Sequence, residues 1–114
     1  MEVLAIIPAR GGSKRLPRKN MVLLGGKPLV QHTIEQAKAA DRISRIIVVT
    51  DDEEIERLAR GLDVNTLKEP AALADDDIPM PSVIQWVLMT LQKYESYRSQ
   101  LVVLLQPTSP LRLS

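Results

Sequence analysis

The chain has 114 residues, of which 45% are hydrophobic and 25% are charged. This composition is typical of one folded globular domain and excludes a disordered, collagen-like or coiled-coil protein. The sequence contains no cysteine, which excludes disulfides, thiol catalysis and cysteine-ligated metal centres. The first apolar run is too short to cross a bilayer and does not follow a basic segment, so we expect a cytoplasmic protein without a membrane partner.

The formal net charge of +1 conceals an uneven distribution. Residues 1–27 carry six cations against one acid, whereas residues 28–114 carry nine cations against thirteen acids. A short basic segment fits a compact polyanion such as a nucleotide. A nucleic acid needs a broad basic surface and often stacking aromatic residues, which are only 3% of this chain. No nucleic-acid partner is therefore expected.

Continuous apolar runs rich in valine and isoleucine predict strands that are buried on both faces of a parallel sheet. Three such runs occupy residues 3–9, 45–50 and 101–106, and a weaker candidate occupies residues 64–67. The intervals between these runs show helical periodicity. The predicted fold is therefore α/β, an open parallel sheet with flanking helices and right-handed crossovers, in a single domain.

Three helices are predicted between these strands. The first begins at Pro28, because proline is favoured at the first helical position. The second follows Thr50 and Asp51, each of which has the spacing of a capping box with the glutamate three residues later. The third runs from about Pro81 to Tyr94. The side chains predicted to face the core are Leu29, Val30, Thr33, Ile34 and Ala37, then Ile55, Leu58, Ala59 and Leu62, then Val83, Ile84, Val87, Leu88 and Leu91.

A glycine-rich basic loop follows the first predicted strand. Residues 9–20 contain two glycines and five cations. Glycine lets backbone amides approach an anion closely, and lysine and arginine donate charge-assisted hydrogen bonds to phosphate oxygens. The loop has neither the Walker A spacing nor the G-x-G-x-x-G pattern. Ligands of open α/β sheets bind beyond the carboxyl ends of the strands, so this position favours a phosphate-binding loop over a solvated basic turn.

Other polar residues have simpler structural interpretations. Asp51 is interpreted chiefly as a helix cap. The consecutive Asp75, Asp76 and Asp77 are interpreted as solvated or turn-forming residues rather than metal ligands, so no metal site is assigned. His32, within the first predicted helix, is interpreted as structural.

The sequence resembles the acylneuraminate cytidylyltransferases, which activate sialic-acid-type nonulosonic acids as CMP-sugars. The resemblance rests on the segments IIPARGGSKRLPRKN, GGKPL, TDDEEI, PAALADD and LLQPTSPLR, which follow the family's order and spacing over nearly the whole chain. It implies a Rossmann-like fold of the nucleotide-diphosphosugar transferase type, with residues 101–106 forming an edge strand beside residues 3–9. It also implies CTP and a nonulosonic acid as substrates, Mg²⁺ as cofactor and pyrophosphate as product.

The resemblance further implies roles for individual residues. Lys19 supports charge at the reacting α-phosphate, and Arg10 shares this catalytic role. Asp52 matches the second acid of the TDD segment and helps to shape the site. The residues implied in nucleotide binding are Arg10, Gly11, Gly12, Ser13, Lys14, Asn20, Ala74 and Asp76, and those implied in binding the acceptor sugar are Gln106, Thr108 and Ser109.

Two features depart from the family pattern. Glu69 and Pro70 stand where many members carry Arg-Pro close to the cytosine. The chain is also much shorter than the family's catalytic chains. We therefore expect residues 1–114 to be the truncated N-terminal, nucleotide-binding part of a cytidylyltransferase domain, with the main Mg²⁺ ligands in the C-terminal half. The exposed final strand leads us to expect a homo-oligomer.

The expected function is transfer of CMP from CTP to a sialic- or pseudaminic-type nonulosonic acid. Two alternatives remain open. One is another sugar nucleotidyltransferase, of the 3-deoxy-manno-octulosonate (KDO) type. The other is a truncated, non-catalytic module that binds a nucleotide or takes part in an assembly.

Overall fold

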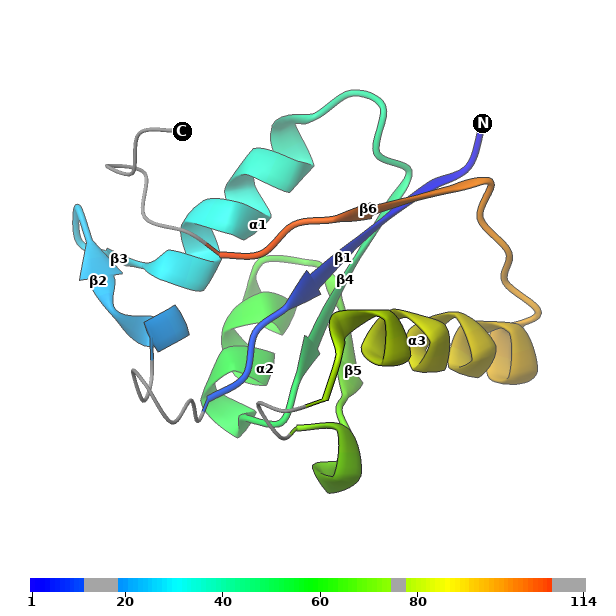
Figure 1. The fold of residues 1–114 in the computed structure, drawn as a ribbon. Coiled ribbons are helices and arrows are strands. Elements are labelled where there is room, and N and C mark those ends of the chain that lie inside the picture. The colour runs from blue at the N-terminus through cyan, green and yellow to red at the C-terminus, as the bar shows by residue number, and fades with distance from the viewer. Residues whose placement is uncertain (12–18, 75–77, 108–114) are drawn as a thin grey trace.

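The computed structural model describes residues 1–11, 19–74 and 78–107. Its centre is a four-stranded parallel sheet in the order β5, β4, β1, β6 (Figure 1). The strands are β1 (Val3–Pro8), β4 (Arg45–Thr50), β5 (Asn65–Lys68) and β6 (Leu101–Leu104). The predicted α/β sheet and its edge strand are confirmed. The range of β4 is as predicted, whereas the ends of β1, β5 and β6 differ by one or two residues from the predicted ranges.

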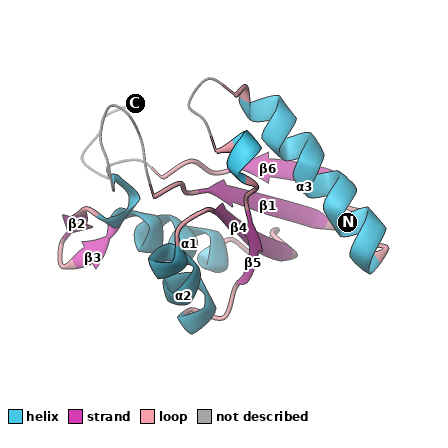
Figure 2. Cartoon of the chain, turned by 90° about the horizontal axis from the view of Figure 1, so that it is seen from below, coloured by secondary structure: helices cyan, strands magenta, loops and turns pink. Residues whose placement is uncertain are grey.

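Helices cover both faces of this sheet. The helices α1 (Leu29–Ala39) and α2 (Glu53–Gly61) pack on one face, and α3 (Met80–Glu95) packs on the other (Figure 2). Two short 3₁₀ turns, η1 (Lys19–Met21) and η2 (Ala71–Leu73), lie near the carboxyl ends of the strands. No helix in the described ranges is long and apolar enough to cross a bilayer.

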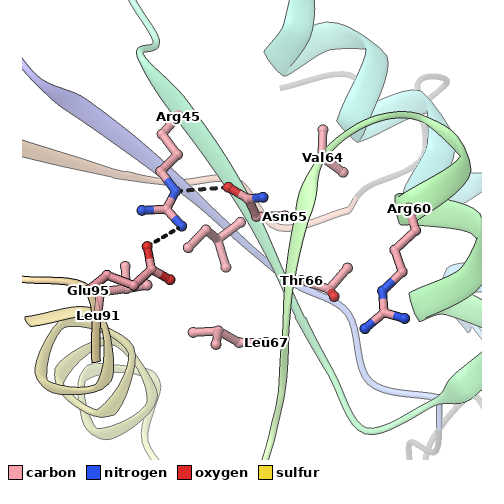
Figure 3. Close-up of a pocket in the computed structure, with 9 residues that line it drawn as sticks. Arg45, Arg60, Val64, Asn65, Thr66, Leu67, Leu91 and Glu95 are labelled. Atoms are coloured by element: carbon pink, nitrogen blue, oxygen red, sulfur yellow. Dashed lines mark hydrogen bonds and ion pairs between the residues drawn. The ribbon is translucent and has the colours of Figure 1, made fainter. Parts of the chain in front are cut away.

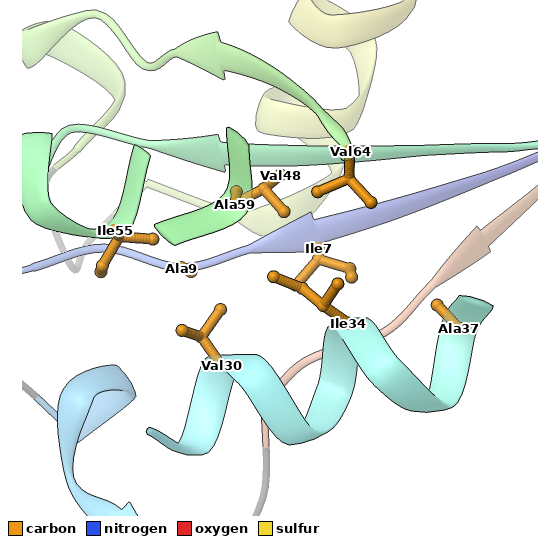
Figure 4. Close-up of a cluster of buried hydrophobic side chains, with 9 residues drawn as sticks. All are labelled: Ile7, Ala9, Val30, Ile34, Ala37, Val48, Ile55, Ala59 and Val64. Carbon is orange, nitrogen blue, oxygen red and sulfur yellow. The ribbon is translucent and has the colours of Figure 1, made fainter. Parts of the chain in front are cut away.

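The continuous apolar runs are explained by this layering. Successive side chains of a strand point to opposite faces. In β1, Leu4 and Ile6 therefore pack under α3, whereas Ile7 packs against α1 and α2. Figure 4 shows the second of these clusters, in which Ile34 of α1 and Ile55 of α2 converge on the sheet. Each fully buried aliphatic side chain contributes about 1.5–3 kcal/mol.

A two-stranded antiparallel sheet was not predicted. It pairs β2 (Leu23–Leu24) with β3 (Lys27–Pro28) through a turn at Gly25 and Gly26, whose φ angles are 63° and 83°. Both central residues of such a turn need positive φ, which glycine adopts without strain. Pro28 is the last residue of β3 and has an extended backbone, with φ −58° and ψ 147°. It is therefore the N-cap of α1 rather than its first residue. The prediction that Pro28 is the first helical residue was wrong.

The cap of α2 also differs from the prediction. Asp52 is the N-cap, and its Oδ1 accepts hydrogen bonds from the backbone N–H of Glu54 at 2.8 Å and of Ile55 at 3.1 Å. Thr50 and Asp51 were the predicted caps, and both assignments were wrong. Thr50 is the last residue of β4, and its Oγ1 instead accepts from the N–H of Asp52 at 3.0 Å.

Candidate functional site

The carboxyl ends of three strands meet at one edge of the molecule. Backbone hydrogen bonds continue beyond the strands, from Ala9 N–H to the Val49 carbonyl and from Glu69 N–H to the Thr50 carbonyl, each at 2.9 Å. The residues that follow β1, β4 and β5 are therefore neighbours. They include Arg10, which was predicted in the site, and Glu69, which was not.

Arg10 connects three segments at this edge. Its guanidinium NH1 donates to the Ala74 carbonyl at 2.5 Å, and its own carbonyl accepts from Asn20 Nδ2 at 2.8 Å. Asn20 lies in η1 and is only 6% exposed, and Ala74 follows η2. The structure thus brings together Arg10, Asn20 and Ala74, which are far apart in sequence and were all predicted as nucleotide-binding residues.

Asp51 holds the start of the basic loop. Its Oδ1 accepts a hydrogen bond from the Gly11 backbone N–H at 3.0 Å. A side chain at position 11 would collide with Asp52, because a Cβ built on Gly11 lies 2.7 Å from the Asp52 Cβ. Glycine is therefore required by close packing. The two acids exchange their expected roles, since Asp52 caps α2 and Asp51 faces the loop.

Glu69 also lies at this edge, and the sequence singled it out only as a departure from the family pattern. It is 3% exposed, and neither carboxylate oxygen has a hydrogen-bond partner among the residues that the structure describes. Burial raises the pKa of Glu69 to about 7, with a further increase from Asp51 and an opposing effect of Arg10. The signal in the sequence was the departure of Glu69 from the family pattern. The structure adds its burial, which is uncommon for an acidic side chain without a partner and is typical of functional sites.

The remaining predicted residues are placed only in part. Gln106 is exposed and follows β6, where the Leu105 N–H donates to the Ile6 carbonyl at 3.0 Å. Gln106 therefore leaves the sheet beside the end of β1. Lys19 begins η1. The predicted Gly12, Ser13, Lys14, Asp76, Thr108 and Ser109 lie outside the described residues.

His32 fits the structural interpretation. It lies in α1, and its Nε2 is 2.5 Å from the carbonyl oxygen of Leu24 in β2. The contact ties the short antiparallel sheet to the first helix.

A pocket at the opposite end of the strands has a structural explanation. Figure 3 shows Arg45 of β4 between Asn65 of β5 and Glu95 of α3. The Arg45 Nε donates to Asn65 Oδ1 at 2.9 Å, and its NH2 forms an ion pair with Glu95 Oε1, also at 2.9 Å. The guanidinium also lies 4.6 Å from the centre of the Tyr97 ring. These polar groups satisfy one another, and their contacts hold α3 against the sheet. The candidate site is therefore the carboxyl edge of the sheet rather than this pocket.

Known proteins match the chain over nearly its whole length. A family model described as Cytidylyltransferase matches residues 4–112. N-acylneuraminate cytidylyltransferase of Escherichia coli is 40% identical, over 97% of this chain and 25% of that protein. CMP-N,N'-diacetyllegionaminic acid synthase of Legionella pneumophila is 42% identical, over 98% of this chain and 48% of that protein.

A solved structure agrees with these matches. CMP:2-keto-3-deoxy-manno-octonic acid synthetase, complexed with CTP, is similar with a TM-score of 0.72 and 26% sequence identity. The similarity covers 98% of this chain and 42% of that one. The chain thus spans from a quarter to about half of the length of the relatives it matches.

Proposed function

Because the chain belongs to the cytidylyltransferase family, we propose that it forms the nucleotide-binding part of an enzyme that transfers CMP from CTP to a nonulosonic acid. The observation that carries this proposal is the position of Arg10. The residue follows β1 at the carboxyl edge of the sheet and holds segments from η1 and η2 around it. The matches to an N-acylneuraminate cytidylyltransferase and to a CMP-N,N'-diacetyllegionaminic acid synthase support an acceptor of that class.

In the proposed complex, residues 10–14 bind the triphosphate. Cations on a loop anchored to a buried strand need little reorganisation to receive negative charge. Asn20 and Ala74 lie beside Arg10 and are assigned to the nucleoside, together with Asp76. Lys19 and Arg10 support the charge that develops at the α-phosphate. Gln106, Thr108 and Ser109 are assigned to the acceptor sugar at the β6 side.

The proposed reaction is an in-line substitution at phosphorus. The hydroxyl oxygen on the anomeric carbon of the acid attacks the α-phosphorus and forms a new O–P bond. The bond between the α-phosphorus and the oxygen that bridges to the β-phosphorus breaks, and pyrophosphate leaves with the electron pair. The hydroxyl proton passes to solvent. Such transfers depend mainly on positioning and electrostatic stabilisation, which cationic loops supply.

Mg²⁺ is proposed from the resemblance as the ion that accompanies CTP. No group of three or more potential ligand side chains converges within the described ranges. Mg²⁺ commonly takes only one or two protein carboxylates together with substrate phosphates and water. The described residues by themselves therefore do not supply a complete metal site.

A KDO-type acceptor is the second candidate. A 3-deoxy-manno-octulosonate cytidylyltransferase of Wigglesworthia glossinidia brevipalpis is 37% identical to the chain over 112 residues. The solved structure described above belongs to a protein that acts on the same kind of sugar acid. Pyrophosphate release from CTP, measured in parallel with sialic, pseudaminic, legionaminic and 3-deoxy-manno-octulosonic acids, distinguishes the two candidates.

Calorimetric titration of the chain with CTP and Mg²⁺ tests the binding step. Arg10→Ala and Lys14→Ala should each weaken CTP binding by roughly ten-fold or more, because each removes a charge-assisted hydrogen bond to the triphosphate. Arg57→Ala, which removes an exposed cation from α2, is the matched control and should bind normally. Unchanged affinity in both loop variants would overturn the proposal. Binding without turnover would agree with a truncated nucleotide-binding part, whereas turnover by these 114 residues alone would contradict the expected truncation.

A further inference from the structure

Three buried acceptor atoms mark the carboxyl edge of the sheet. Among the described residues, the buried side-chain atoms without a hydrogen-bond partner are Asn20 Oδ1 and the two carboxylate oxygens of Glu69. The other end of the Asn20 amide donates to the Arg10 carbonyl, which identifies Oδ1 as the end that lacks a partner. Buried polar atoms are nearly always satisfied in native proteins. A ligand that donates hydrogen bonds at this edge would satisfy these atoms.

The chemistry of CTP limits which part of the ligand they meet. Its ionised phosphates only accept hydrogen bonds, so they do not satisfy a carboxylate or an amide oxygen. The donors of CTP are the amino group on the cytosine ring and the hydroxyls of the ribose. In the proposed complex with CTP, acceptors at this edge would therefore face the nucleoside.

The strand order places Glu69 toward the base. The sheet runs β5, β4, β1, β6, and Glu69 follows β5, at the edge opposite β6. In the proposed function, the triphosphate lies at the loop after β1 and the acceptor sugar lies toward Gln106 after β6. In the in-line reaction the acceptor oxygen and the leaving pyrophosphate lie on opposite sides of the α-phosphorus, and the nucleoside is attached through a third oxygen. In the proposed complex the nucleoside therefore lies away from both groups, on the side of β4 and β5.

Resting on the proposed function, we propose that Glu69 selects cytosine by accepting a hydrogen bond from the amino group on C4 of the base. Carboxylates are suitable acceptors for this amino group. Uracil carries a carbonyl oxygen at the same position, and two acceptors facing each other in a buried site repel. A site built to bind a particular N–H discriminates strongly against an analogue that lacks it.

The charges around Glu69 set the conditions of the test. Because the pKa of Glu69 is raised to about 7, the group is mostly an ionised acceptor at pH 8. At that pH the Kd values of CTP and UTP are measured by calorimetry with Mg²⁺. The wild-type chain should bind CTP roughly ten-fold or more tightly than UTP. Both nucleotides carry the same triphosphate, so their Kd ratio isolates the base.

Glu69→Gln is the informative variant. The glutamine amide offers a donor as well as an acceptor, so it accommodates either base, and the UTP:CTP Kd ratio should fall to within roughly three-fold of unity. Glu35→Gln makes the same chemical change in the exposed ion pair between Lys27 of β3 and Glu35 of α1 and should leave the ratio unchanged. A circular-dichroism melt verifies that each variant is folded.

A nucleotide analogue tests the same contact without any mutation. Pyrimidin-2-one riboside triphosphate lacks the amino group and carries no oxygen at C4, so the wild-type chain should bind it less tightly than CTP and more tightly than UTP. An unchanged ratio in folded Glu69→Gln, or equal wild-type affinity for CTP and the analogue, overturns the assignment of Glu69 while triphosphate binding stands. Failure of the wild-type chain to bind either nucleotide overturns the proposed function itself.

Discussion

Glu69 shows how a single buried carboxyl group links stability to pH. Its desolvation favours the protonated form, and the nearby Asp51 adds to this effect. The folded-state pKa of about 7 lies above the ordinary value of 4.5, so the folded chain binds this proton more tightly than the unfolded chain does. Stability is therefore highest when Glu69 is protonated in both states.

Glu69→Gln should remove this pH dependence. Below about pH 4.5 the wild-type carboxyl is protonated in both states and carries no penalty. Between about pH 4.5 and 7 the unfolded chain loses the proton first, so wild-type stability falls as pH rises, and the penalty is complete above about 7. The free energy of unfolding of the variant minus that of wild type should be larger at pH 8 than at about pH 4.5. We expect this increase to be on the order of 2–3 kcal/mol.

Urea denaturation at the two pH values measures this gain. Glu35 supplies a control of opposite sign, because hydrogen bonds from Gln31 and Lys27 lower the pKa of its exposed carboxyl. Glu35→Gln should gain nothing over wild type as pH rises. A Glu69→Gln variant with the same pH profile as wild type would show that the Glu69 carboxyl is not desolvated.

The second helix illustrates what local sequence predicts at the scale of an element. Its apolar spacing located the helix and its buried Ile55 and Ala59, because helical periodicity is a property of neighbouring residues. Its cap was assigned to the wrong residue because three polar residues in succession, Thr50, Asp51 and Asp52, all have capping chemistry. The choice among them depends on where β4 ends. The β2–β3 pair was missed because two residues per strand carry no periodic signal.

Asp52→Ala should destabilise the chain by about 1 kcal/mol, because the Glu54 and Ile55 amides lose their acceptor. Asp52→Asn should keep most of this stability, since an amide oxygen caps a helix nearly as well. Thermal or urea denaturation compares the two variants. An equal loss in both would assign the effect to the charge of Asp52 rather than to its hydrogen bonds.

At the scale of the whole molecule, β6 leaves one side of the sheet open. Within the described part of the chain, β6 pairs only with β1. Its Leu101 is 51% exposed, and the following residues are only partly buried. An exposed apolar edge strand presents unpaired backbone groups to other chains. The homo-oligomer expected from the sequence remains a prediction, and this edge is its proposed contact.

Leu101→Lys should reduce the self-association of the chain, because a charge at a strand edge opposes pairing with another copy. Sedimentation velocity over a series of concentrations measures the effect. Met89→Lys is the matched control, since Met89 is 63% exposed but lies on α3. Equal loss of association in both variants would point to general hydrophobic contact, and no change in Leu101→Lys would exclude the β6 edge.

The sequence by itself determined the α/β class, the order of the four strands of the main sheet and the three α-helices, and the buried face of each helix, because periodicity and apolar runs are local. Its motifs also identified the cytidylyltransferase family, now supported by the match over residues 4–112. Only the tertiary structure decided that Asp51 faces Gly11 while Asp52 caps α2, and that Glu69 is buried beside Arg10. Those contacts depend on how β1, β4 and β5 end side by side, which the spacing of residues along a chain does not specify.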